Sequence, residues 1–199
     1  IIGSEGTLAI IEEITYYTVE DLKDKASSLI YFKDIKEACS AVTKLKLAKE
    51  ANTINVEAVE LMDRAGLKSI ENDPAMPAFI KDFDENVTAL LIETRAISDA
   101  QLDIQTAQIE ELLKEFSVVR DIYFTKDVAE YTLYWKIRKG LFPAVGAVRV
   151  TGTTVIIEDV AYPIECLADA TLELQDLFQK HGYSEALIFG HALEGNFHF

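Results

Sequence analysis

Cysteine and long apolar runs are both scarce in this sequence of 199 residues. Its two cysteines, Cys39 and Cys166, lie far apart and have no CxxC partner, which indicates reduced thiols in a cytoplasmic protein. No apolar run approaches the roughly 20 residues that span a bilayer, and no signal-peptide pattern opens the chain. The sequence therefore predicts neither a transmembrane segment nor export.

Basic residues are also few. The chain holds 19 basic residues against 34 acidic ones, which gives a formal net charge of −15. This charge opposes the field that gathers a phosphate backbone or an anionic membrane surface, so we expect no nucleic-acid partner. A small anionic substrate would also be repelled at long range, and its site would need a locally placed cation.

Helical and strand patterns alternate along a chain long enough for one medium domain or two small halves. Strand patterns cover 27–32, 54–59, 87–94, 118–124, 153–160 and 186–189, and helical patterns cover 34–51, 61–70, 98–113, 126–140 and 164–180. The alternation predicts an α+β fold of ferredoxin-like build, in which two halves share one mainly antiparallel sheet with helices packed on it. The helices are too few to cover both faces of a doubly wound sheet.

Two of the three histidines, His191 and His198, fall within the last nine residues. If Gly195-Asn196 closes a two-residue hairpin, Leu193 lies opposite His198 and His191 lies diagonal to it on the same face. Two imidazoles on one face can hold a divalent ion at about 2.1 Å per bond. The alternative is that both histidines simply occupy a strand and a turn.

A divalent ion also needs a third protein ligand. Glu158 and Asp159 are candidates from the preceding strand, where only one of the two can face the site because successive strand residues point to opposite sides. Glu194 is the third candidate. All three carboxylates can equally be solvated or capping charges.

The local cation is expected at Arg138, because a guanidinium grips a carboxylate bidentately and stays charged when desolvated. The competing interpretation is that a basic residue near a helix end complements the helix dipole. At the other end of the chain, 3–8 (Gly-Ser-Glu-Gly-Thr-Leu) is a small-residue turn where backbone can approach a ligand. It matches neither the GxGxxG pattern nor a P-loop.

These segments together resemble the FAD-linked oxidases of the vanillyl-alcohol oxidase type, in the branch with D-lactate, glycolate and D-2-hydroxyglutarate dehydrogenases. Residues 2–11 (IGSEGTLAII) look like the last motif of that family's flavin-binding domain. Residues 60–64 (ELMDR) look like its "ELMD" element, and Gly190-His191 followed by 195–198 (GNFH) is similar to its "GHxGDGNLH" metal motif.

The resemblance implies that 1–22 is the tail of a FAD-binding domain and that 23–199 is a cap domain truncated at its C-terminus. Gly3, Ser4, Glu5, Gly6, Thr7 and Leu8 would be a strip of a flavin site whose larger part lies elsewhere. His191 and His198 would hold Zn²⁺ or Mn²⁺, and Arg138 would bind the substrate carboxylate.

The activity implied is oxidation of a small 2-hydroxy acid, such as D-lactate or glycolate, to the 2-oxo acid with hydride transfer to FAD. A second electron acceptor is required and is not identified, and a homo-oligomer stays open. The expected location is cytoplasmic, with peripheral association at an inner membrane as the alternative.

The sequence departs from the family pattern at three points. Glu194 replaces the acid of "GDGN", the relatives' substrate lysine falls near Ile157 or Glu158, and a later Glu-His-Gly stretch is not reached before Phe199. Both chain ends are expected to be cut, and the isolated piece is expected to be inactive. The competing classes are a non-catalytic ferredoxin-like binding or oligomerisation module and a small metal-sensing domain.

Overall fold

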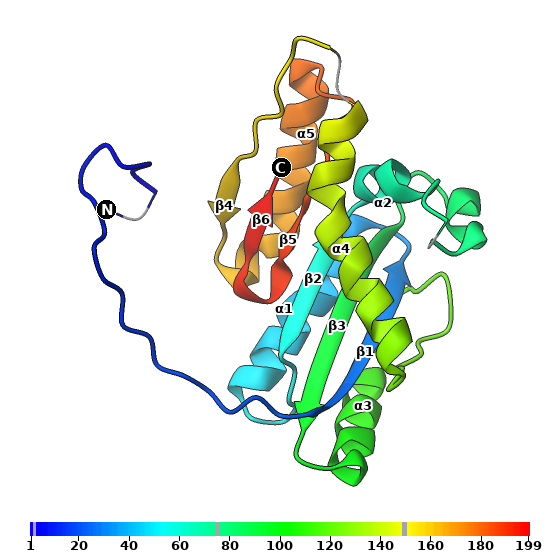
Figure 1. Ribbon diagram of the computed structural model, residues 1–199. Helices are drawn as coiled ribbons and strands as arrows, with labels where there is room; N and C mark the ends of the chain where they lie inside the picture. Colours follow the sequence, from blue (N-terminus) through cyan, green and yellow to red (C-terminus); the bar gives the residue numbers. More distant parts are fainter. Residues whose placement is uncertain (2, 75, 149–150) are drawn as a thin grey trace.

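The computed structural model of the chain describes residues 1, 3–74, 76–148 and 151–199 (Figure 1). Within them, one six-stranded sheet forms in the order β1-β3-β2-β5-β6-β4, with every pair antiparallel. Its strands are β1 (Asp24–Phe32), β2 (Ala58–Met62), β3 (Thr88–Ala96), β4 (Asp159–Ala161), β5 (Phe189–His191) and β6 (Asn196–His198). The helices are α1 (Ile35–Glu50), α2 (Arg64–Ile70), α3 (Asp99–Leu113), α4 (Val128–Val148) and α5 (Leu167–His181), with 3-10 turns at Ala78–Asp82, Ile164–Cys166 and Ala192–Glu194.

The expected α+β fold with an antiparallel sheet is confirmed, and its two halves follow the same plan. Each half is a β-α-β-β unit, β1-α1-β2-β3 in the first and β4-α5-β5-β6 in the second. In each unit the last strand lies between the other two. Because the halves run outward in opposite order, β2 and β5 meet side by side at an approximate twofold axis.

Helices cover both faces of the sheet, more than the sequence predicted. Strand alternation sends Ile30, Leu61 and Leu90 into a core with α1, α3 and α5. It sends Tyr31 and Leu91 to the other face, where residues of α2 and α4 bury them in a second core. The few helices suffice because α4 lies over the strands of the first half, as Figure 1 shows.

Helix starts follow the expected capping chemistry. Asp34 precedes α1 and accepts a hydrogen bond from the backbone N–H of Glu37 at 2.8 Å. Ser98 does the same for α3 with the N–H of Gln101 at 3.3 Å. None of the helices in the described ranges is both long and apolar enough to cross a membrane.

Three expected elements differ in extent. The strand expected over 118–124 is reduced to isolated bridges that pair Val118 with Phe32 and Thr125 with Ser27. The strand expected over 153–160 forms only from Asp159, where β6 supplies a partner. The helix expected to end at 140 continues to 148 through Pro143, and 149–150 lie outside the described residues.

The hairpin that holds the two histidines has a longer turn than predicted. A 3-10 turn at Ala192–Glu194 precedes Gly195, which has a φ of 67°, and Phe189 rather than Leu193 lies opposite His198. A Cβ on Gly195 would meet the carbonyl oxygen of Tyr162 at 2.2 Å. The chain therefore requires glycine there for both its backbone angle and its close approach.

A buried carboxylate joins the two halves directly after β2. Asp63 accepts hydrogen bonds from the N–H of Gly66, at the start of α2, and from the N–H of Ile188, just before β5, at 2.8 and 2.9 Å. Burial raises the pKa of Asp63 to about 7, and the two backbone donors oppose that rise.

Replacing Gly195 by alanine should destabilise the fold far more than the same change at Gly182. Both glycines have positive φ, at 67° and 77°, so each alanine costs about 1–2 kcal/mol of backbone strain. Only Gly195 adds a collision, since nothing lies within 4 Å of a Cβ at Gly182. Urea unfolding should place the Gly195→Ala midpoint below that of Gly182→Ala, and equal midpoints would contradict the close approach.

The contribution of Asp63 to stability should fall as the pH rises from about 4 to about 7. A pKa raised to about 7 means that the folded protein still holds the proton where the unfolded chain has released it. Asp63→Asn removes this titrating group, so the free energy of unfolding of the variant should increase relative to that of the wild type as the pH rises. Urea midpoints of both proteins between pH 4.5 and 7.5 would measure this, and a constant difference would refute the raised pKa.

Candidate functional site

The candidate site lies on the α4 face of the sheet, at the seam between its halves. Val59 and Leu61 enter the first core, so alternation turns Glu60 toward α4. In β5 the same alternation turns His191 toward α4, and Glu60 and His191 are paired across the seam. The sheet therefore brings an acid and a histidine together from residues far apart in the sequence.

Arg138 of α4 forms a buried ion pair with Glu60. Its Nε and Nη2 atoms lie 2.9 and 2.8 Å from Oε2 of Glu60. Arg138 is 9% exposed and Glu60 is 5% exposed. Neither charge could be buried at this depth without the other, because an unpaired ion in the interior is strongly destabilising.

The two C-terminal histidines come together as the sequence predicted, although in a different register. Their ring centroids are 5.5 Å apart with an interplanar angle of 86°. Nδ1 of His191 lies 2.8 Å from Oε1 of Glu60. Phe189 packs against both His198, at 5.3 Å between centroids, and the guanidinium of Arg138, at 4.8 Å. Arg138 and His191 thus both contact Glu60, and His198 joins this cluster through His191 and Phe189.

The environment of His198 favours its neutral form. Burial lowers the pKa of this imidazole below its usual value, and electrostatic interaction with the guanidinium of Arg138 and with the neighbouring ring of His191 lowers it further. Asp159, whose Oδ1 lies 3.5 Å from Nδ1 of His198, opposes the shift. A neutral ring keeps a nitrogen lone pair that can accept a proton or bind a cation.

Each of the two rings has a carboxylate beside Nδ1, Glu60 for His191 and Asp159 for His198, which is the usual way that a ligating histidine is held. The two rings contact each other edge to face, with their centroids 5.5 Å apart.

A metal centre needs a third protein ligand besides the two histidines. Among the residues described, no group of three His, Cys, Asp or Glu side chains could hold an ion. Three carboxylates were considered from the sequence as a third ligand. Asp159 lies beside Nδ1 of His198, not beside Nε2, and Glu194 pairs with Lys46 at 3.0 Å. Glu158 lines a pocket. The described residues therefore supply two ligands of a possible set.

Glu60 is the site residue that sequence reasoning did not assign. In the sequence, Glu60 stands out only as the first residue of the ELMD element. The signal was present, because an acid stands in the middle of the apolar strand Ala58-Val59-Glu60-Leu61-Met62. A charge at such a position needs a buried partner, but the sequence does not say which cation meets it.

A second buried carboxylate fixes α4 over the sheet. Glu93 of β3 accepts hydrogen bonds from the indole N–H of Trp135 at 2.6 Å, from Arg95 at 2.8 Å and from the hydroxyl of Ser27 at 3.2 Å. Trp135 precedes Arg138 by three residues, so both lie on the same side of α4. Two neighbouring strands thus each hold this helix through a buried acid.

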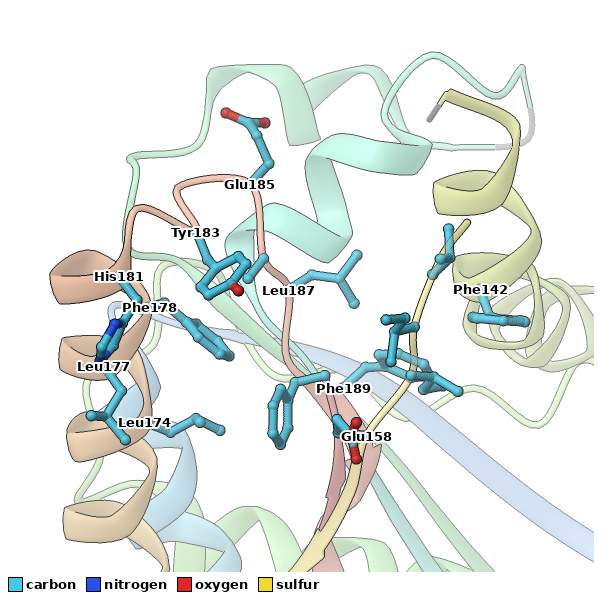
Figure 2. A pocket seen from close by; sticks show the side chains of 15 residues that line it. Phe142, Glu158, Leu174, Leu177, Phe178, His181, Tyr183, Glu185, Leu187 and Phe189 are labelled. Atoms are coloured by element: carbon cyan, nitrogen blue, oxygen red, sulfur yellow. The ribbon is translucent and has the colours of Figure 1, made fainter. Parts of the chain in front are cut away.

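A mainly apolar pocket of about 550 Å³ adjoins the cluster (Figure 2). Leu174, Leu177 and Phe178 of α5 form one side, and Phe142 of α4 lies on the other. Phe189 is common to the pocket and the cluster. The polar members of the lining include Glu158, Glu185, His181 and Tyr183.

The turn at 3–8 lies apart from this cluster. In Figure 1 residues 3–22, which precede β1, form an arm that extends away from the sheet. Its turn is closed by hydrogen bonds from the N–H and the hydroxyl of Thr7 to the carbonyl of Ser4, at 2.9 and 2.6 Å. Gly3, Glu5 and Gly6 have positive φ, and Leu8 is exposed.

Known proteins resemble this chain over nearly all of its length. It is 28% identical to a mitochondrial D-lactate dehydrogenase [cytochrome] of Arabidopsis thaliana, over 100% of this chain and 32% of the relative. It is 29% identical to a probable mitochondrial D-2-hydroxyglutarate dehydrogenase of Oryza sativa subsp. japonica, over 99% of this chain and 34% of the relative. A D-lactate dehydrogenase of Anaerostipes hadrus is 25% identical, over 99% of this chain and 40% of the relative. The chain thus spans about a third of the length of the first two.

The fold has a counterpart among solved structures. An alkyldihydroxyacetonephosphate synthase matches with a TM-score of 0.63 at 13% identity, over 89% of this chain and 35% of that one. The family model described as "FAD linked oxidases, C-terminal domain" matches residues 22–199. With the expected fold and the whole-length relatives, this match shows that the chain belongs to the FAD-linked oxidase family as its C-terminal domain.

Proposed function

We propose that this chain is the substrate-side domain of a flavin-dependent dehydrogenase that oxidises a small 2-hydroxy acid to the 2-oxo acid. The observation that carries the proposal is the cluster in which Arg138 and His191 contact Glu60 and His198 packs against His191. Relatives of similar sequence are D-lactate and D-2-hydroxyglutarate dehydrogenases, which supports this substrate class.

Arg138 would hold the substrate carboxylate. The chain as a whole carries a net charge of −15, so an anion needs a cation at close range. Glu60 engages the Nε and Nη2 side of the guanidinium, and a ligand carboxylate would use the remaining N–H donors. Burial of the pair in a place of low dielectric strengthens each of these hydrogen bonds.

His191 and His198 would face the hydroxyl end of the substrate. Through their Nε2 atoms they would hold a divalent ion such as Zn²⁺ or Mn²⁺, which lowers the pKa of a bound hydroxyl when it is present. The lowered pKa of His198 keeps its ring neutral for that role near pH 7. FAD would supply the hydride acceptor, and the chain's own task is to position the acid.

Residues 1–22 would belong to the flavin-binding domain, and 23–199 to the cap. The exposed turn at 3–8 would touch FAD there, through backbone that its glycines leave accessible. The larger part of the flavin site would come from outside these 199 residues. A second electron acceptor would complete the cycle.

Arg138→Lys should weaken binding of D-lactate by about tenfold. Lysine keeps the charge that Glu60 requires but loses the planar fork that grips a carboxylate. The loss of one charge-assisted hydrogen bond corresponds to roughly 1.5–3 kcal/mol. Isothermal titration with D-lactate, and with D-2-hydroxyglutarate as a second probe, would measure the change.

Lys139→Gln is the matched control for that experiment. Lys139 is the next residue of α4, but its side chain is exposed. Its variant should bind within twofold of the wild type. Equal losses in the two variants, or equal affinity for propionate, which lacks the hydroxyl group, would reject the proposed site.

His191→Ala should lower the affinity for Zn²⁺ or Mn²⁺ by tenfold or more. The two neighbouring imidazoles would supply the pair of ligands, so removal of one leaves a single weak contact. His181→Ala removes the third histidine, which lies on α5, and should have no such effect. Calorimetric titration of the three proteins decides the matter, and identical affinities would remove the metal from the proposal.

A further inference from the structure

The two oxygens of Glu60 serve different partners. Oε2 accepts from Nε and Nη2 of Arg138, at 2.9 and 2.8 Å, while Oε1 lies 2.8 Å from Nδ1 of His191. Glu60 is 5% exposed, so water is largely excluded from this carboxylate. Its geometry links the guanidinium of one helix to the imidazole of a strand from the other half of the sheet.

Hydrogen-bond chemistry restricts how this trio can be arranged. A guanidinium only donates, and an ionised carboxylate only accepts. Nδ1 of neutral His191 must therefore carry the proton to bond with Oε1, which leaves the lone pair on Nε2. The ring nitrogen that faces away from Glu60 is thus the one able to bind a cation or accept a proton.

We propose that Glu60 is a positioning residue, which fixes the Nδ1–H tautomer of His191 while it orients the fork of Arg138. The role of Glu60 rests on the proposed function only in what the oriented groups then bind. The alternative is a purely structural ion pair, in which Glu60 balances the charge of Arg138 and the tautomer of His191 is set by solvent. His191 is half exposed, with 58% of its side chain accessible, so this alternative is a real competitor.

Glu60→Gln distinguishes the two roles because Arg138 cannot accept a hydrogen bond. The arginine should take the amide oxygen of the new side chain, which turns its NH₂ group toward His191. That NH₂ donates, so Nδ1 must become the acceptor and the proton must move to Nε2. The expected result is a reversal of tautomer in a side chain of nearly unchanged shape.

The measurement is a long-range ¹H–¹⁵N spectrum of the histidine rings in the full 199-residue chain. The wild type should show His191 with Nδ1 protonated, and Glu60→Gln should show it with Nε2 protonated. Glu57→Gln is the control, since it removes one exposed carboxylate just before β2 and should leave the spectrum unchanged. His181 serves as an internal reference in every spectrum.

A double variant tests the reasoning in the opposite direction. In Glu60→Gln combined with Arg138→Met, no donor claims the amide oxygen, so the amide can present either its oxygen or its NH₂ group to Nδ1 of His191. A mixture of the Nδ1–H and Nε2–H tautomers should therefore replace the single form of each of the other two proteins. This variant also buries no unpaired charge, so it keeps the test decisive if the single variant is unstable.

Neither measurement requires flavin, metal or substrate. A His191 tautomer that stays unchanged in Glu60→Gln, or in the double variant, would overturn the role of Glu60 and leave the proposed function standing. Conversely, reversal in the single variant and a mixture in the double variant, in a protein that binds no 2-hydroxy acid, would support Glu60 and defeat the proposed function.

Discussion

A carboxylate at the centre of an otherwise apolar strand needs opposite charge and hydrogen bonds, and the candidate site depends on this need. Glu60 lies in β2 between residues that enter the hydrophobic cores, so it cannot reach bulk water. Arg138 of α4 forms an ion pair with it, and His191 of β5 forms a hydrogen bond with it. The same requirement at Glu93, answered by Trp135 and Arg95, holds α4 at a second point. Helix, sheet and site are therefore joined by two acids.

Local patterns were enough to predict the class of fold and part of the site. Alternation and capping marked α1 and β3, since Asp34 and the apolar run after Val87 act within a few residues. His191 and His198 were expected to lie close together because a hairpin restricts the paths open to residues 191–198. The acidic composition led to the expectation of a local cation, for which Arg138 was the candidate.

Long-range partners were beyond the sequence. Glu60 and His191 belong to different halves and are 131 residues apart in the sequence, so no local rule selects their pairing. The predicted register of the hairpin was wrong because Gly195 packs against the backbone of Tyr162, which lies outside the hairpin. The segment 118–124 lies beside the edge strand β1 but pairs with it only through bridges at Val118 and Thr125, and the local pattern does not indicate how much of an apolar stretch will pair.

The seam between the halves has a mechanical consequence. In the sheet, three residue pairs join β2 to β5, and the first core is shared by residues of both halves. Arg138 lies on α4, which contacts strands of the first half, while His191 and His198 belong to the second half. A molecule bound by Arg138 and by the two imidazoles would therefore add a further link between the halves. Its binding would stiffen the domain and raise its melting temperature with concentration, so heat resistance becomes a direct report of occupancy.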